Sequence, residues 1–174
     1  EHVAKAYAGV PALRDGRLSL RAGSVHALCG GNGAGKSTFL SILMGITQRD
    51  AGSILLNGAP VQFNRPSEAL AAGIAMITQE LEPIPYMTVA ENIWLGREPR
   101  RAGCIVDNKA LNRRTRELLE SLEFDVEATS PMHRLSVAQI QLVEIAKAFS
   151  HDCQVMIMDE PTSAIGEHEA QTLF

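Results

Sequence analysis

A chain of 174 residues is long enough for one domain, or for one core with an inserted lobe. Apolar residues make up 45% and charged residues 21%, a globular composition that excludes a disordered chain. The net charge of -4 and the lack of a basic stripe argue against a nucleic-acid-binding protein, and no apolar run is long enough to span a membrane.

The chain begins at Glu1 rather than Met and shows no secretory signal, so we expect a trimmed or processed N-terminus. Its cysteines, Cys29, Cys104 and Cys153, are scattered and lack the spacing of metal ligands. They are typical of small buried residues in a reduced compartment, which indicates the cytosol.

The first 29 residues predict the strands of a small sheet. Residues 2–10, the alternating residues 18–20 and the apolar run 24–29 each have a strand pattern. The run 24–29 leads directly into a glycine-rich stretch. Tyr7 is one of two tyrosines, and its spacing alone indicates ordinary packing.

The glycine-rich stretch fits a phosphate loop, which is Gly, four residues and Gly-Lys-Ser/Thr. Glycines let the backbone approach a ligand closely, and successive N–H groups then line an anion-binding concavity. A lysine that reaches the β- and γ-phosphates and a hydroxyl that ligates Mg²⁺ complete the pattern. A ligand-free glycine turn is the alternative, but the apolar run before and the helical spacing after the loop disfavour it. The candidate nucleotide-binding residues are Gly30, Gly31, Asn32, Gly33, Ala34, Gly35, Lys36, Ser37 and Thr38.

The next segment predicts a hairpin, a helix and a buried strand. Residues 53–58 end in Asn57-Gly58, a strong hairpin signal, and residues 61–63 are the partner strand. A helix is expected to begin at Pro66 and to end before Gly73. The apolar residues 74–78 then predict a strand that leads into Gln79.

Helices dominate the prediction from residue 85 onward. Thr88 and Glu91 have the spacing of a capping box for a helix through Trp94, and Asp107 is a second N-cap candidate. The basic residues of that second helix predict a solvated face, with a partner-docking surface as the alternative. Ser136 and Gln139 have capping-box spacing for a third helix, which on its own indicates a core helix and nothing more. The basic residues are Arg113, Arg114 and Arg116.

The apolar run 155–158 predicts a strand covered on both faces, and it ends in two carboxylates. At the carboxyl edge of such a strand, beside a phosphate loop, Asp159 is placed to bind Mg²⁺ through water. Glu160 is placed to orient or deprotonate an attacking water. An acidic turn without a ligand is the weaker alternative.

The order of these motifs resembles that of the ATP-binding-cassette (ABC) ATPases, over essentially the whole chain. The motifs are Tyr7, Gly30–Thr38, Gln79, Leu135–Gln139 and Met158–Thr162. Three further stretches are similar to ATP-binding subunits of bacterial simple-sugar importers of the ribose, galactose and arabinose kind; these are Ile77–Leu81, Met87–Glu98 and Leu142–Ala148. In that family two cassettes usually share one polypeptide, and this chain resembles most of the first.

The resemblance implies roles for the matching residues. Tyr7 would stack on adenine, and Gly30–Thr38 would be the Walker A loop, with Lys36 acting in catalysis. Gln79 would contact Mg²⁺ or the attacking water, together with the metal ligands Ser37 and Asp159, and Glu160 would be the general base. The signature residues Ser136 and Gln139 would face the γ-phosphate held by another cassette.

Three features depart from the family pattern. Ala138 stands where the signature has Gly, and its methyl group would hinder close approach to phosphate. Gly166 stands near a position where Asp or Thr is more usual. The switch histidine should lie beyond Phe174, since none of the five histidines matches its place: His2, His26, His133, His151 and His168.

We therefore predict an α/β P-loop ATPase core with a small antiparallel β subdomain and an inserted helical subdomain, truncated at its C-terminus. Residues 1–84 and 152–174 would form the core, and residues 85–151 the helical subdomain. ATP and Mg²⁺ are the expected ligands. The expected partners are a second cassette, permease subunits and, indirectly, a periplasmic sugar-binding protein, at the cytoplasmic face of the inner membrane and without nucleic acid.

Two other functions remain open at this point. One is a cassette ATPase outside transport, acting in DNA repair or translation, which the acidic balance disfavours. The other is a regulatory module that binds ATP without turnover, which Ala138 and the unmatched histidine keep open. For the same reason we expect the 174-residue chain by itself to hydrolyse ATP weakly or not at all.

Overall fold

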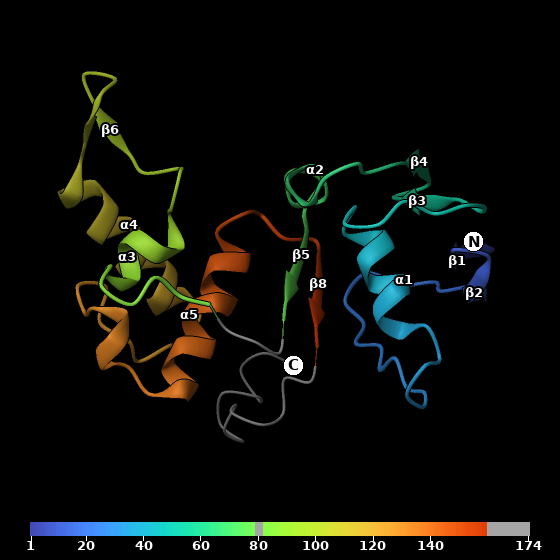
Figure 1. Ribbon diagram of the computed structural model, residues 1–174. Helices are drawn as coiled ribbons and strands as arrows, with labels where there is room; N and C mark the ends of the chain where they lie inside the picture. The colour runs from blue at the N-terminus through green and yellow to red at the C-terminus, as the bar shows by residue number, and fades with distance from the viewer. Residues whose placement is uncertain (79–81, 160–174) are drawn as a thin grey trace. The chain divides into compact units, whose positions relative to one another are not determined.

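The computed structural model describes residues 1–78 and 82–159 (Figure 1). The chain divides into two compact units, Glu1–Ala75 and Met76–Phe174. The first unit holds the predicted phosphate loop, and the second holds the helix that begins after Ser136 and the strand before Asp159. The predicted boundaries of the helical subdomain, 85 and 151, stay a prediction.

Two antiparallel hairpins belong to the first unit. β1 (Val3–Tyr7) pairs with β2 (Val10–Gly16), and β3 (Ile54–Leu56) pairs with β4 (Ala59–Val61). Asn57 and Gly58 connect β3 to β4 with φ angles of 52° and 79°. A tight hairpin turn of this kind requires two positive φ angles, which Asn and Gly adopt readily. The hairpin predicted from Asn-Gly is confirmed.

Helix α1 (Lys36–Leu43) packs its inner face on these hairpins. Phe39 and Ile42 are buried against Val3 of β1 and Ile54 of β3, and these four residues form a hydrophobic cluster of the first unit. The contact anchors α1 directly after the phosphate loop, so the start of the helix is held in place. Helix α2 (Pro66–Ala71) begins at Pro66, as predicted, because proline suits a first helical turn.

Two predicted strands, residues 18–20 and 24–29, are not strands in this structure. Every residue from Arg17 to Ala34 is exposed, and neither segment pairs with a strand among the described residues. An apolar or alternating pattern gives a segment the propensity for a strand. The strand itself needs a neighbouring strand to satisfy its backbone N–H and C=O groups. The prediction of these two strands is therefore wrong for this structure.

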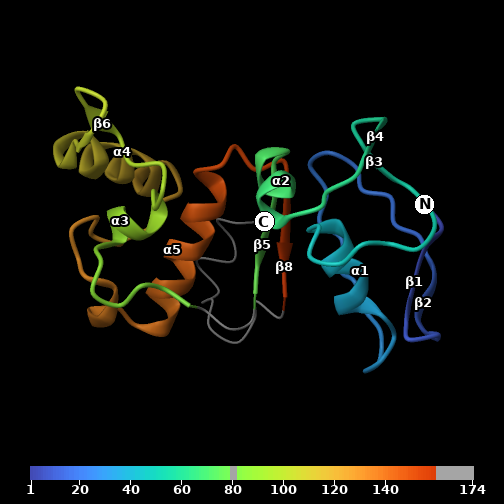
Figure 2. The same ribbon diagram turned by 45° about the horizontal axis from the view of Figure 1, so that its top comes forward.

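Three helices dominate the second unit. α3 (Val89–Ile93) packs against both α4 (Asn108–Ser121) and α5 (Val137–Phe149), and Figures 1 and 2 show it between them. The capping box of Thr88 and Glu91 and the N-cap of Asp107 are both present, as predicted. A short 3₁₀ helix (Met132–Arg134) precedes α5. Ile93, Leu119, Met132, Val143 and Ile145 lie in the core of this unit.

The remaining strands are short. β5 (Ile74–Ile77) pairs with β8 (Val155–Met158), and both run in the same direction (Figures 1 and 2). The amide of Asp159 donates to the carbonyl of Ile77 over 3.0 Å, so the pairing continues past the end of β8. β6 (Arg100–Arg101) and β7 (Ile105–Val106) form a separate hairpin between α3 and α4 in the sequence.

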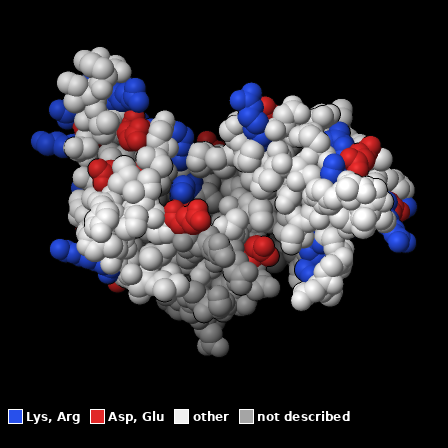
Figure 3. All heavy atoms as spheres, in the orientation of Figure 1, with Lys and Arg blue, Asp and Glu red and all other residues white. Residues whose placement is uncertain are grey.

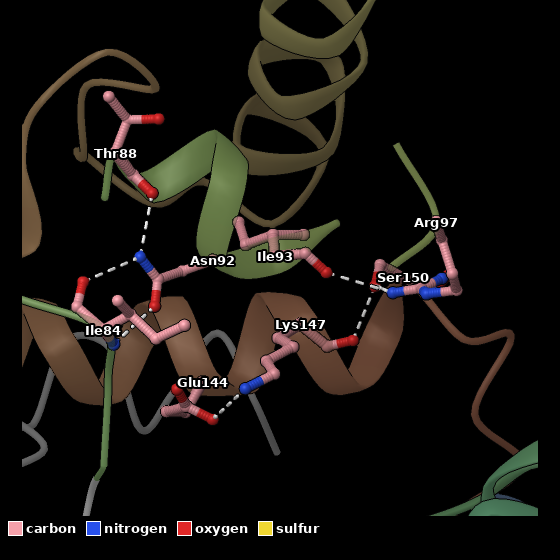
Figure 4. Close-up of polar contacts among 8 residues, drawn as sticks. All are labelled: Ile84, Thr88, Asn92, Ile93, Arg97, Glu144, Lys147 and Ser150. Atoms are coloured by element: carbon pink, nitrogen blue, oxygen red, sulfur yellow. Dashed lines mark hydrogen bonds and ion pairs between the residues drawn. The ribbon is translucent and has the colours of Figure 1, made fainter. Parts of the chain in front are cut away.

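Two polar side chains fix α3 in the second unit (Figure 4). The buried amide of Asn92 exchanges hydrogen bonds with the backbone of Ile84, at 2.8 Å and 3.2 Å, and donates to the Thr88 carbonyl. The Arg97 guanidinium donates to the carbonyl of Ile93, and to the carbonyl and hydroxyl of Ser150 at 2.8 Å and 2.7 Å. Arg97 thus ties the end of α3 to the end of α5. Burial lowers the pKa of this arginine.

Candidate nucleotide-binding site

The loop from Gly30 to Gly35 is exposed up to Ala34 and leads directly into α1. Gly33 and Gly35 have φ angles of 81° and 85°, in the left-handed region that favours glycine. A Cβ on Gly35 would lie 2.7 Å from the carbonyl oxygen of Ala12, so this position has no room for a side chain. The pattern of glycines therefore matches the backbone geometry that the loop adopts.

The Lys36 side chain folds back over this loop. Its Nζ donates to the carbonyl of Gly30 at 2.5 Å and to that of Gly31 at 3.2 Å. Among the described residues, Lys36 forms no ion pair with a carboxylate, so its charge is available to an anion. The cation is held at the first two residues of the loop, beside the N–H groups that would bind phosphate.

The start of α1 adds to this positive site. No side chain caps the helix at Gly35, and its first turn contains no acidic residue. The free N–H groups and the helix dipole therefore both favour an anion here. The Ser37 hydroxyl, one residue further along, is exposed and accessible to a ligand or a metal ion. The loop N–H groups and the ammonium suit the phosphates of a nucleoside triphosphate, and the hydroxyl suits its Mg²⁺.

Tyr7 ends β1 and is 48% exposed. Ordinary core packing therefore does not explain this residue. The Lys5 ammonium lies 5.6 Å from the centre of the Tyr7 ring. One face of the ring is thus near a cation, and an exposed aromatic ring offers a surface on which a base can stack. The predicted adenine contact stays a prediction.

Ser136 is the N-cap of α5, and the predicted capping box is present. The Gln139 amide donates to the Ser136 hydroxyl at 3.3 Å, and the Ser136 amide donates to the Gln139 side-chain carbonyl at 3.0 Å. Both predicted signature side chains therefore bind each other. Ala138, in the first turn of the same helix, is half-buried.

Replacing Ser136 with Ala is expected to raise the hydrogen-exchange rate of the Gln139 amide about fivefold. The cap is worth about 1 kcal/mol, and the variant lacks the oxygen that accepts this N–H. Amide exchange measured by NMR or mass spectrometry checks the result. A Ser136→Thr variant keeps a capping hydroxyl and serves as the control. An unchanged rate in the Ala variant would show that the cap does not hold the first turn.

Asp159 follows β8 and is half-buried. Its amide donates to the Ile77 carbonyl, as described above, so the residue stands directly after the ends of β5 and β8. Among the described residues no group of three His, Cys, Asp or Glu side chains could hold a metal ion by itself. The predicted residues Gln79, Glu160 and Gly166 lie outside the described residues.

The predicted site residues therefore fall in both units. Tyr7 and the loop residues through Thr38 lie in Glu1–Ala75, and Ser136, Gln139 and Asp159 lie in Met76–Phe174. Within the first unit the structure brings together the loop glycines, the Lys36 ammonium and the start of α1. Within the second, it brings together Ser136 and Gln139.

Sequence reasoning missed Asn92 and Arg97, which position the helices of the second unit (Figure 4). No sequence signal identified them, because most of their partners are backbone carbonyls of residues 84, 88, 93 and 150. A polar side chain that pairs with distant backbone has no characteristic spacing.

Comparison with known proteins agrees with this geometry. A family model described as ABC transporter matches residues 13–163. A putative ribose/galactose/methyl galactoside import ATP-binding protein 2 of Burkholderia lata is 52% identical over 99% of the chain. The ribose import ATP-binding protein RbsA of Rhodopirellula baltica is 51% identical over 100% of the chain. The chain spans about a third of the length of these curated relatives, 33% and 34%.

The fold also matches solved structures. The ADP conformation of MJ1267, an ATP-binding cassette of an ABC transporter, superposes with a TM-score of 0.82 at 25% identity. This match covers 99% of the chain and 72% of the solved one. A nucleotide-free ATP-binding cassette from an ABC transporter superposes with a TM-score of 0.81 at 24% identity. The predicted α/β fold of an ABC ATPase is confirmed, and the chain belongs to the ABC transporter family as an ATPase domain.

Proposed function

We propose that this chain is the ATP-binding and ATP-hydrolysing cassette of an importer that brings a simple sugar across the bacterial cytoplasmic membrane. The observation that carries the proposal is the exposed glycine loop with the Lys36 ammonium held over it at the start of α1. Relatives named as ribose and galactose import ATP-binding proteins support the sugar class.

The residues of the first unit bind the nucleotide. The N–H groups of Gly33 and Gly35 donate to the phosphate oxygens, and Lys36 donates to the β- and γ-phosphates. Tyr7 stacks on the adenine ring through its exposed face. Thr38, in the first turn of α1, contributes its N–H group to the positive end of the helix.

Hydrolysis needs a general base and a site for the metal ion. Glu160 accepts the proton of the water that attacks the γ-phosphate in line with the leaving oxygen. Ser37, Gln79 and Asp159 would hold Mg²⁺, which would supply positive charge to balance the charge on the phosphate oxygens. The few protein ligands suit Mg²⁺, since this ion keeps several waters and binds through one or two carboxylates plus phosphate oxygens.

A second cassette completes the ATP site. The Ser136–Gln139 end of α5 presents the positive end of the helix to the γ-phosphate bound by the other cassette. The relatives' greater length is consistent with a second cassette in the same polypeptide. ATP-driven closure of two cassettes would change the access of permease subunits to the sugar, which a periplasmic binding protein delivers.

The protein is proposed to act at the cytoplasmic face of the membrane as a peripheral subunit, without nucleic acid. No helix among the described residues is both long and apolar enough to cross a bilayer.

One observation favours a second candidate, a cassette that binds ATP without turnover. Ala138 places a methyl group at a signature position where the family pattern has none.

Deleting the gene is expected to abolish uptake of one sugar among ribose, galactose and methyl galactoside. Uptake of labelled sugar by whole cells measures the effect, and the unaltered gene should restore it while a Lys36→Ala copy should not. The protein should also co-purify with membrane subunits. Unchanged uptake of every sugar, together with co-purification of nucleic acid, would contradict the import function.

A further inference from the structure

Positive charge is concentrated in residues 97–116, which we call the basic arm. This stretch holds seven of the 16 Lys and Arg residues and two of the 20 Asp and Glu residues. The rest of the chain therefore has nine basic and 18 acidic residues, and the overall charge of -4 conceals an arm that is strongly positive. The arm comprises the β6–β7 hairpin and the first part of α4, and Figure 3 shows Lys and Arg side chains gathered around both elements.

Most of this charge is not neutralised within the arm. Arg100, Lys109, Arg114 and Arg116 are exposed, and none forms a salt bridge with a carboxylate in the part of the chain that the structure describes. The two acidic residues offset only part of this charge, and the Gly96 amide and, less strongly, the nearby Arg100 lower the pKa of Glu98. Glu98 accepts from the Gly96 amide, and Asp107 pairs with Arg101 at 2.5 Å and caps α4.

The Asp107 carboxylate stabilises the basic arm through contacts with other residues of the arm. Hydrogen bonds from Arg101 and from the amide of Ala110 lower its pKa to about 2. The group is therefore ionised at neutral pH, and the Arg101 pair persists over the physiological range. The Asp107 amide also donates to the Pro99 carbonyl at 2.7 Å. These contacts fix the base of a hairpin whose strands are only two residues long.

Apolar residues lie among these charges. Ile105 is 65% exposed and Val106 is 40% exposed, although both are aliphatic. They line a hollow of about 230 Å³ together with Arg101, Asp107, Asn108 and Lys109. A surface on which basic residues flank exposed aliphatic side chains is typical of proteins that bind the interface of an anionic membrane.

We propose that the basic arm binds the anionic phospholipid surface of the membrane, with Ile105 and Val106 inserted among the headgroups. Charge complementarity selects this partner, since the arm is positive while the rest of the chain would be repelled. A single-stranded nucleic acid fits less well, because residues 97–116 contain no Phe, Tyr or Trp on which bases could stack. The inference rests on the proposed membrane location, and it is tested without nucleotide or sugar so that the two can fail separately.

The test measures binding of the natural-length protein to vesicles. Vesicles of phosphatidylcholine with phosphatidylglycerol should bind the protein, and vesicles of phosphatidylcholine alone should not. The triple variant Arg100→Gln, Lys109→Gln, Arg116→Gln should bind the anionic vesicles about 100-fold more weakly, at about fivefold for each lost charge. Ile105→Ser should weaken binding roughly threefold, and added salt should weaken it further.

A matched control removes three exposed arginines outside the arm, Arg14→Gln, Arg21→Gln and Arg65→Gln, and should bind like the unaltered protein. Equal binding to both kinds of vesicle, or equal losses in the triple variant and its control, would overturn the proposal. A further binding experiment uses single-stranded RNA in place of vesicles. Binding of RNA that needs Arg100, Lys109 and Arg116, with no binding to vesicles, would overturn it in favour of a nucleic-acid surface.

Discussion

Replacing Lys36 with Ala is expected to abolish measurable ATP binding by this cassette. The Lys36 ammonium lies over the loop, 2.5 Å from the Gly30 carbonyl and 3.2 Å from that of Gly31. Two charge-assisted hydrogen bonds to phosphate are worth about 1.5–3 kcal/mol each, so their loss weakens ATP affinity by about 100-fold or more. Isothermal titration of the protein with ATP measures the change.

The fold should survive this change, because Phe39 and Ile42 anchor α1 through contacts that do not involve the lysine. Circular dichroism of the variant checks this point. Lys109→Ala, which removes the same charge from the exposed start of α4, is the matched control and should bind ATP normally. Unchanged ATP affinity in Lys36→Ala would contradict the assignment of the phosphate loop to the nucleotide site.

A Glu160→Gln variant is expected to bind ATP with ordinary affinity and to hydrolyse it about 10²- to 10⁴-fold more slowly. Glutamine keeps the size of the side chain but cannot accept a proton from the attacking water, and a general base contributes about this factor. Asp159, the preceding residue, is held to β5 through the Ile77 carbonyl, so the chain enters this position from an anchored strand. Phosphate release from the natural-length protein measures the rate.

Glu127→Gln provides a control, because it removes an exposed carboxylate of the second unit and should leave the rate unchanged. If the unaltered protein and Glu160→Gln bind ATP equally and hydrolyse it equally slowly, the proposal that this cassette is an ATPase is overturned. The cassette would then be a regulatory module that binds ATP, the function that Ala138 favours.

The sequence predicted best the caps, turns and helix starts whose interacting groups lie within a few residues of one another. The capping boxes of Thr88 with Glu91 and of Ser136 with Gln139 are present, and so is the Asn57-Gly58 turn. Each depends on a side chain and a backbone group three residues apart, or on the φ angles of two adjacent residues. The predicted start of α2 at Pro66 is confirmed for the same local reason.

Sequence predicted least well those features whose partners are distant. Residues 18–20 and 24–29 have strand patterns but no strand beside them in the described structure. Asn92 and Arg97 hold the helices of the second unit through backbone carbonyls, and no spacing reveals such contacts. The exposure of Tyr7 and the isolation of Ile105 on a basic hairpin likewise depend on what else packs nearby.

The sequence by itself indicated the family and predicted the chemistry, because the phosphate loop and its flanking motifs depend on residue types at short spacings. The glycines at positions 33 and 35 and the lysine that follows them are part of that phosphate-loop pattern. Only the tertiary structure decided where the Lys36 ammonium lies, and that a Cβ at position 35 would meet the Ala12 carbonyl. Only tertiary packing decides which surfaces stay exposed, since burial depends on segments that meet from far apart in the chain. For that reason the charges of the basic arm could be counted in the sequence, but their exposure beside Ile105 and Val106 became visible only in three dimensions.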